Sequence, residues 1–179
     1  MKKLSLFLCA ALMGMMFISC GSSKQAAKDE HCCMSTKDDF KAKGSYLAKN
    51  RPAEPYAEQA AMTMAREELA TMMEATIARV IENYSSNYID GDAVEFKASM
   101  KGLSRTVVKQ KVKDTKACDE WVEVDKDGSK MFYKCVKMSA SDVLNEVNDK
   151  VSKDAKLRTD YEYEKFKQTF EKEMEKLAE

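Results

Sequence analysis

Apolar residues recur at helical spacing over a long segment in the first half of the chain. Between Ala57 and Tyr84 there is no glycine or proline. The apolar stripe consists of Met62, Ala65, Leu69, Met73, Ile77, Val80 and Tyr84. This period predicts one long helix whose stripe faces a core. Small side chains at its start permit another element to approach closely; they are Ala57, Ala60, Ala61 and Ala65.

Three further helical segments follow. Asp92 is placed to cap a helix whose apolar stripe is Phe96, Met100, Leu103 and Val107. The polar residues 139–142 cap another, which carries Val143, Leu144, Val147 and Val151. The charged residues 152–179 place Tyr163, Phe166, Phe170, Met174 and Leu177 at helical spacing. This last segment contains no breaker, so it either continues the preceding helix or folds back on the domain.

A β-hairpin is predicted between the second and third helices. Residues 118–124 and 131–138 are rich in strand-forming side chains, and Asp125-Lys126-Asp127-Gly128 between them predicts a type I turn with glycine in the left-handed position. Cys118 and Cys135 then lie nearly opposite each other. A direct pairing requires residue numbers that sum to 253, and a three-residue loop with a glycine bulge requires 254. Both registers remain open.

These patterns together predict an α+β fold, with long helices packed on a small antiparallel sheet that contains the hairpin. Both prolines, Pro52 and Pro55, stand just before the first helix, as helix-excluding residues do. Residues 44–48 are a candidate short strand at the entry to the domain. The expected organisation is a signal peptide at 1–19, a tether and lead-in at 20–55, an α+β domain at 56–151 and a charged C-terminal helix at 152–179.

The N-terminal residues predict export and lipid attachment. Lys2 and Lys3 precede an apolar run from Leu4 to Ile18, which is too short for a permanent membrane helix and typical of a secretory signal. Residues 17–20, Phe-Ile-Ser-Cys, resemble the lipobox of bacterial lipoproteins, in which the cysteine thiol accepts diacylglycerol. We therefore expect lipidation at Cys20 after cleavage, with an ordinary secretory signal as the alternative. Two or more acyl chains hold a protein stably on a membrane.

Composition and charge narrow the class of protein. Lys2 and Lys3 account for two of the 30 basic residues, so the mature chain carries 28 basic against 30 acidic side chains. The charges are interspersed, which argues against nucleic acid as a partner and against a polybasic membrane patch. Residues 20–179 are enough for one small domain. The predicted attachment to the membrane is therefore the lipid.

The sequence predicts neither a catalytic residue, nor a metal site, nor a cofactor. The only histidine, His31, lies in the tether, so the domain has no histidine-based acid–base pair. His31-Cys32-Cys33 offers three ligand types in a row, but adjacent residues cannot all converge on one tetrahedral ion, and a tether with oxidised or unused thiols is favoured. Asp125–Gly128 resembles the start of a calcium loop, but Val136 stands where the bidentate glutamate belongs. We expect no enzymatic activity.

The number of cysteines fits an oxidising compartment. Cys9 leaves with the signal peptide and Cys20 is lipidated, so Cys32, Cys33, Cys118 and Cys135 remain. An even number in an exported chain predicts disulfides. Cys118–Cys135 is the favoured pair because both residues flank one turn. The alternative is two small buried side chains without a bond.

The order of elements resembles the LPP-twenty lipoprotein family. The resemblance covers residues 57–151 and rests on the Ala-Arg-x-x-Leu-Ala core at 65–70, a second helix, a hairpin with the aromatic Trp121 and a closing helix. Similar domains occur in the flagellar-ring assembly protein FlgT. The resemblance implies an α+β domain anchored in the cell envelope, with the outer membrane as the expected location. It implies no catalytic residues, and the charged residues 152–179 extend beyond the shared pattern.

The expected function is therefore that of a non-enzymatic lipoprotein of the cell envelope that binds an envelope protein or supports assembly. An alternative is a carrier of a small apolar ligand or lipid, with a groove lined by Met72, Met73 and Phe96. An apolar pocket of ~300 Å³ or more would favour the carrier, and a filled core would favour the binding protein. An enzyme is the least favoured class.

Overall fold

The computed structural model describes residues 32–90 and 93–179, which form one compact unit. The signal peptide at 1–19, the predicted lipidation site Cys20 and the predicted cap Asp92 lie outside the described residues. The elements, in chain order, are β1 (Asp39–Ala48), a 3-10 turn η1 (Arg51–Ala53), α1 (Glu54–Tyr88), α2 (Ala93–Lys113), β2 (Ala117–Val124), β3 (Lys130–Ser139), α3 (Ala140–Lys153), α4 (Leu157–Asp160) and α5 (Tyr163–Ala178).

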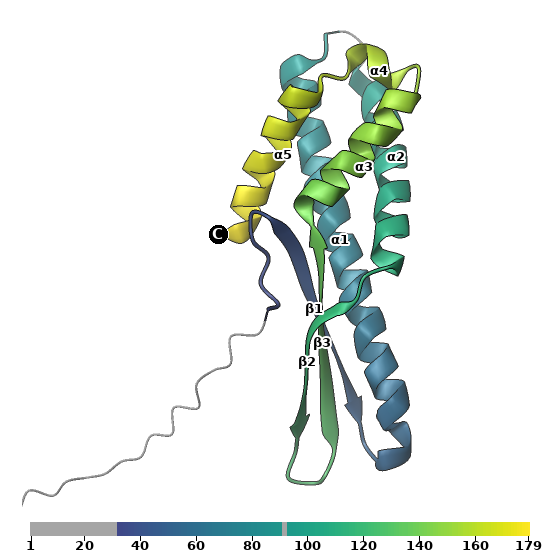
Figure 1. The fold of residues 1–179 in the computed structure, drawn as a ribbon, viewed down its shortest axis with the longest axis vertical. Coiled ribbons are helices and arrows are strands. Elements are labelled where there is room, and N and C mark those ends of the chain that lie inside the picture. Colours follow the sequence, from purple (N-terminus) through teal and green to yellow (C-terminus); the bar gives the residue numbers. More distant parts are fainter. Residues whose placement is uncertain (1–31, 91–92) are drawn as a thin grey trace, which may run out of the picture. The chain divides into compact units, whose positions relative to one another are not determined.

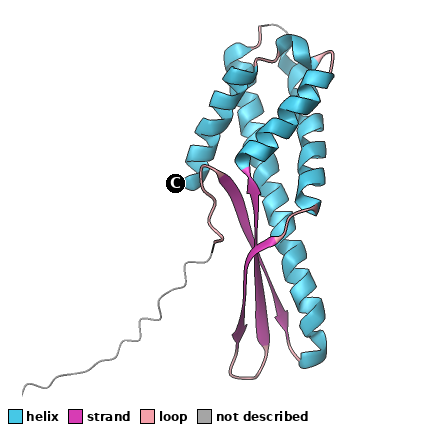
Figure 2. Cartoon of the chain, viewed as in Figure 1, coloured by secondary structure: helices cyan, strands magenta, loops and turns pink. Residues whose placement is uncertain are grey.

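The fold is α+β, as the sequence predicts (Figure 2). The three strands form one antiparallel sheet in the order β1-β3-β2, so the central strand is the second strand of the hairpin. The helix α1 packs along β1 and β3 with its first half and against α2 and α5 with its second half (Figure 1). One helix therefore joins the sheet to the helical part of the domain.

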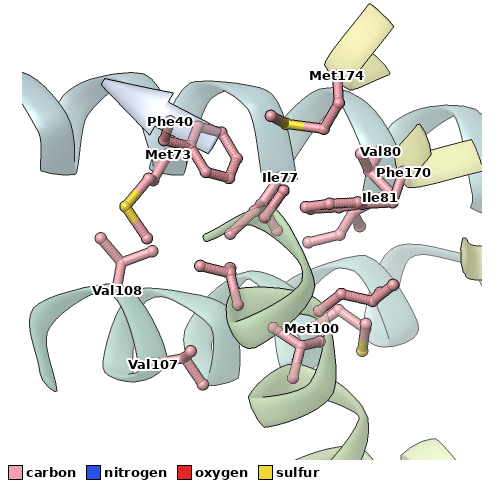
Figure 3. Packing of buried hydrophobic residues seen from close by; sticks show 14 of the residues in the cluster. Phe40, Met73, Ile77, Val80, Ile81, Met100, Val107, Val108, Phe170 and Met174 are labelled. Carbon is pink, nitrogen blue, oxygen red and sulfur yellow. The ribbon is translucent and has the colours of Figure 1, made fainter. Parts of the chain in front are cut away.

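The predicted stripe of the first helix faces the core. Ala65, Leu69, Met73, Ile77, Val80 and Tyr84 are all buried, and Met62 is half-buried. They pack with residues of β1, β3 and every other helix. Figure 3 shows Phe40, Met73, Ile77, Val80, Ile81, Met100, Val107, Val108, Phe170 and Met174 in this cluster. The methionines of the stripe thus serve mainly as core packing.

The helix α1 runs from Glu54 to Tyr88, a few residues beyond the predicted limits Ala57 and Tyr84 at each end. Pro55 lies in the first turn of α1, where a missing backbone N–H is tolerated.

The cap of α3 is as predicted, because the Ser139 hydroxyl accepts a hydrogen bond from the Asp142 N–H at 3.3 Å. The buried residues of α3 include the predicted stripe Val143, Leu144, Val147 and Val151.

The C-terminal segment folds back on the domain. The helix α3 ends at Lys153, the single turn α4 follows, and α5 packs against α1. The Tyr84 hydroxyl joins these parts, because it donates to the Asp160 carbonyl at 3.0 Å and accepts from the Glu162 N–H at 2.7 Å. Phe166, Phe170 and Met174 are buried in the shared core. Residues 157–179 are thus part of the domain.

The strand before the first helix is longer than the sequence indicates. The sequence predicts a short strand at residues 44–48, whereas β1 has 10 residues, from Asp39 to Ala48. It pairs with the whole of β3, from Asp39 opposite Ser139 to Ala48 opposite Lys130. The described part of the expected tether therefore belongs to the folded unit. Its alternation is hard to recognise in the sequence because Gly44 stands in the row of apolar positions that includes Phe40 and Ala42.

Truncation of Leu69 should destabilise the domain strongly. Leu69 is fully buried in the core cluster, so Leu69→Ala should lower the free energy of unfolding by about 2–5 kcal/mol through lost transfer energy and a residual cavity. Met64 lies on the exposed side of the same helix, and Met64→Ala is the matched control, with an expected change within about 0.5 kcal/mol. Urea denaturation of the two variants measures both values. A loss below about 0.5 kcal/mol for Leu69→Ala would contradict the packing.

Candidate functional site

Two disulfides hold the N-terminal segment on the sheet. Cys32 is bonded to Cys118 of β2, with their Cα atoms 6.7 Å apart, and Cys33 is bonded to Cys135 of β3, with their Cα atoms 5.3 Å apart. Cys135 is fully buried. Neighbouring cysteines thus reach neighbouring strands, and the chain is cross-linked where it enters the domain.

The predicted bond between Cys118 and Cys135 is wrong, although both residues form disulfides. The hairpin adopts the register with pair sums of 254, in which Asp119 lies opposite Cys135. Cys118 lies at an irregularity between Ala117 and Asp119, so it does not face Cys135. The turn has the predicted geometry, because Gly128 has φ of 85° and Asp125 N–H donates to the Ser129 carbonyl at 2.9 Å.

The sequence reasoning missed Cys32 and Cys33 as disulfide partners. The signal was present, because four cysteines allow three different pairings and two of those pairings join the vicinal cysteines to the hairpin. The proximity of Cys118 and Cys135 in sequence favours a bond between them, but the observed register places Asp119 opposite Cys135. Cys33 can reach Cys135 because β1 runs beside β3 and pairs Lys43 with Cys135.

The segment after the disulfides also covers part of the outer edge of β1. The Ser35 hydroxyl donates to the Lys41 carbonyl at 3.1 Å and accepts from the Lys41 N–H at 2.9 Å. Thr36 and Asp39 exchange two further bonds, N–H to carbonyl at 2.9 Å and N–H to hydroxyl at 3.1 Å. The backbone groups of Asp39 and Lys41 are therefore occupied at this edge of the sheet.

An aromatic pair lies on the face of the sheet opposite α1. Trp121 and Tyr133 are paired across β2 and β3, and their rings stack with centroids 4.7 Å apart. The Lys43 ammonium lies 5.6 Å from the centre of the Tyr133 ring, within range of a cation–π contact. The Tyr133 hydroxyl donates to Glu123 at 3.0 Å. Burial and the Glu123 carboxylate both raise the pKa of Tyr133, so its hydroxyl remains a donor at neutral pH.

On the face toward α1, a buried lysine joins three elements. The Lys134 ammonium of β3 binds Glu58 of α1 at 2.8 Å and also binds Glu120 of β2. Burial would lower the pKa of Lys134, but the two carboxylates outweigh it and raise the pKa above its ordinary value. A lysine held in its charged form by two acids is a poor nucleophile or base. We therefore interpret this group as a structural cross-link.

Glu173 of α5 is a buried carboxylate, and perturbed carboxylates of this kind are candidates for catalytic acids. It accepts hydrogen bonds from Arg79 at 3.2 Å and from Asn83 at 3.0 Å, both on α1, and pairs with Lys176. Burial alone would raise the pKa of Glu173, but Lys176 and Arg79 together lower it. Both carboxylate oxygens have partners, and a general acid at neutral pH requires a raised pKa. The arrangement fits a helix-to-helix ion pair better than a catalytic group.

The residues expected to line a carrier groove do not come together in one. Met73 is fully buried and Phe96 nearly so, both within the core cluster, and Met72 is half-buried. Phe96 also lines a cavity of about 400 Å³, where its neighbours include the charged Glu95, Lys156 and Asp160. A cavity of about 390 Å³ between α3 and α5 likewise mixes Phe170 and Met174 with charged side chains. Neither cavity is the predominantly apolar pocket that a lipid carrier needs.

The described residues contain neither a cluster of metal ligands nor a membrane-spanning helix. Within residues 32–90 and 93–179, no group of three or more histidine, cysteine or acidic side chains is placed to hold a metal ion. No helix in the same ranges combines the length and apolar character needed to cross a bilayer.

Among the described residues, several exposed apolar side chains lie at the hairpin end of the sheet. We call it the sheet tip, and define it by Tyr46, Leu47, Tyr56, Val122 and Val124, all of which are exposed. Tyr46 and Tyr56 pack edge to face with ring centroids 5.5 Å apart. Clustered apolar side chains at one end of a domain are typical of a surface that contacts another protein.

The fold and these sites define a disulfide-cross-linked α+β domain with an aromatic and aliphatic sheet tip. Comparisons with protein-family models, with curated proteins and with solved structures gave no match.

Proposed function

We propose that this protein is an exported, lipid-anchored envelope protein whose domain binds another protein and catalyses no reaction. The observation that carries the proposal is the pair of disulfides that joins Cys32 and Cys33 to β2 and β3. Such bonds form and persist in oxidising compartments outside the cytoplasm. The apolar run from Leu4 to Ile18 and the cysteine at position 20 support the same compartment.

The short spacing between the lipid and the disulfides supports a role close to a membrane. Only residues 21–31 separate Cys20 from Cys32. Even fully extended, this stretch spans no more than about 40 Å, since each residue adds about 3.5 Å. A lipid on Cys20 would hold the domain within that distance of the bilayer, with the outer membrane as the proposed location. Membership of the LPP-twenty lipoprotein family is part of this proposal, and it rests on the shared order of helix, helix, hairpin and helix.

Binding fits the described side chains better than catalysis does. The two buried ionisable groups described above, Lys134 and Glu173, are both paired with opposite charges. The sheet tip, in contrast, presents apolar side chains to solvent. A partner protein would bury them and gain free energy from their removal from water.

The lipid anchor is tested by Cys20→Ser. This substitution removes the thiol that accepts the lipid, so the protein should move from the membrane fraction to the soluble fraction and lose labelling by a fatty-acid analogue. Cys9→Ser, in the apolar run of the signal, is the matched control and should leave both properties unchanged. Continued membrane attachment of the Cys20→Ser protein would show that the anchor lies elsewhere.

Protein binding is tested by site-specific photocrosslinking in intact envelopes. A photoreactive residue at Tyr56, on the sheet tip, should give a discrete crosslinked product with another protein. The same residue at Glu164, exposed at the start of α5, is the control and should give none. Equal products from both positions, or none from Tyr56, would contradict a binding surface at the tip.

A further inference from the structure

The two outer edges of the sheet differ in how their backbone groups are used. Among the described strands, β1 and β2 each pair only with β3, so each leaves one row of N–H and C=O groups pointing outward. On β1, Ser35 and Thr36 occupy the outward groups of Lys41 and Asp39. On β2, the Glu120 N–H is bonded to the carboxylate of Asp119 at 2.8 Å. The even-numbered residues of β2 therefore direct their backbone groups to the outer edge.

Two exposed valines lie in the half of β2 that precedes the hairpin turn. Val122 is 46% exposed and Val124 is 66% exposed, and both lie on the side of the sheet that faces α1. No basic residue lies within β2, whereas Asp119, Glu120 and Glu123 do. Asp119 and Glu123 lie on the opposite side from the valines, because side chains alternate along a strand. On the side that faces α1, β2 thus carries Val122 and Val124 together with Glu120, which is paired with Lys134. On the other side it carries Asp119 and Glu123, with Trp121 between them.

A second copy of this chain is a poor occupant of that edge. If two β2 strands paired edge to edge in antiparallel orientation, acidic side chains would face acidic side chains, and like charges opposite one another are destabilising. Pairing of β2 with the β1 edge of another copy would have to displace the hydrogen bonds that Ser35 and Thr36 already make at Lys41 and Asp39. The acidic side chains of Asp119 and Glu123 instead complement a strand that carries basic side chains.

We propose that the outer edge of β2 accepts an extended segment of a partner protein as a fourth strand. The segment alternates basic and apolar residues, with the apolar ones beside Val122 and Val124 and the basic ones beside Asp119 and Glu123. Backbone hydrogen bonds to the outer row supply affinity, and the alternation supplies specificity. This inference rests on the proposed function, because it specifies how the partner binds.

The probe is a synthetic peptide, acetyl-Lys-Val-Lys-Val-Lys-Val-Lys-amide, added to the full mature chain carrying Cys20→Ser. In NMR spectra of the labelled protein, shifts should concentrate on residues 119–124 and leave residues 39–48 unchanged. Hydrogen exchange at the amides of Val122 and Val124 should slow when the peptide is bound, because these amides become donors to the added strand.

Control peptides separate backbone pairing from simple charge attraction. The same peptide with N-methyl groups on alternate residues keeps its charge but loses half of its donors, so it should bind at least about tenfold more weakly. A peptide with glutamate in place of lysine should bind more weakly by about the same factor. If the N-methylated peptide binds as well as the parent, the interaction is electrostatic and the fourth strand is ruled out.

Variants of the protein test the same edge. Val124→Pro removes an outward N–H without removing a bond to β3, and prolines are tolerated on edge strands, so it should weaken binding about tenfold. Glu123→Gln should weaken it about threefold, since it removes one exposed charge contact. Glu171→Gln, on the exposed side of α5, is the matched control and should change nothing.

Two results would overturn the inference directly. Absence of peptide binding at millimolar concentration is the first. Slow exchange at Val122 and Val124 in the free protein is the second, because it would mean that a second copy or another part of this chain already occupies the edge. If the peptide fails but photocrosslinking from Tyr56 still captures a protein, the proposed function stands and only the strand-addition mode is wrong.

Discussion

Removal of both disulfides should lower the free energy of unfolding by more than the sum of the two single removals. The bonds close loops of 86 and 102 residues. A disulfide that closes a loop of this length restricts the unfolded chain and so stabilises the folded state by about 4.5 kcal/mol. Once one bond is closed, the other closes a loop of only roughly 18 residues, because Cys32 and Cys33 are adjacent. The second bond is then worth about 3 kcal/mol.

Each single removal should therefore cost about 3 kcal/mol, and the double removal up to about 7.5 kcal/mol. The variants are Cys32→Ser with Cys118→Ser, Cys33→Ala with Cys135→Ala, and all four together. Alanine is used in the second pair because Cys135 is fully buried. Guanidinium denaturation measures the three losses. A fourfold variant that loses no more than either pair would show that the long loop does not govern stability.

The pairing itself is tested by mass spectrometry of the unreduced protein after trypsin digestion. Cys32 and Cys33 fall in one peptide, whereas Cys118 and Cys135 fall in two others, because lysines separate them. The structure predicts one species in which all three peptides are linked. A linked pair containing only Cys118 and Cys135 would contradict it.

Replacement of Gly44 by alanine should destabilise the domain by about 3 kcal/mol or more. A Cβ atom at this position would lie 2.1 Å from the Ala61 carbonyl oxygen and 2.3 Å from the Ala65 backbone nitrogen of α1. Backbone atoms of a helix cannot turn aside as a flexible side chain can, so α1 and β1 would have to separate. Overpacking of a core costs about 1–3 kcal/mol, and contact with backbone atoms of α1 places this case at the upper end or beyond.

Gly102 provides the control for Gly44. It is exposed on α2, and a Cβ atom there would have no neighbour within 4 Å. Gly102→Ala should stabilise the protein by about 0.5–1 kcal/mol, because alanine restricts the unfolded chain and favours helix. Thermal unfolding of the two variants should move in opposite directions. Equal shifts would mean that α1 does not pack on β1 through its backbone.

Local patterns were sufficient to predict most elements. The helical stripe from Met62 to Tyr84 predicted the core face of α1, because residues three and four apart share one face of a helix whatever surrounds it. Ser139 predicted the start of α3, and Gly128 predicted the turn of the hairpin, because caps and turns depend on a few adjacent residues. The small residues of α1 also predicted a close neighbour.

The identity of that neighbour was not predictable, because it depends on a residue outside the helix. Ala57, Ala61 and Ala65 indicate close approach, but only the structure shows that Gly44 of β1 is what approaches. The same limit applies to the edge of β2. Its exposed valines and acidic residues are visible in the sequence, whereas its position at the outside of the sheet follows from the order β1-β3-β2.

The sequence by itself determined the core-facing stripes of the helices and the presence of the hairpin, since each depends on neighbouring residues. Only the tertiary structure decided the hairpin register and the partners of the cysteines. Registers with sums of 253 and 254 satisfy the same local pattern, and the choice moves Cys118 away from Cys135. The actual partners lie 86 and 102 residues away and meet only because β1 pairs with β3.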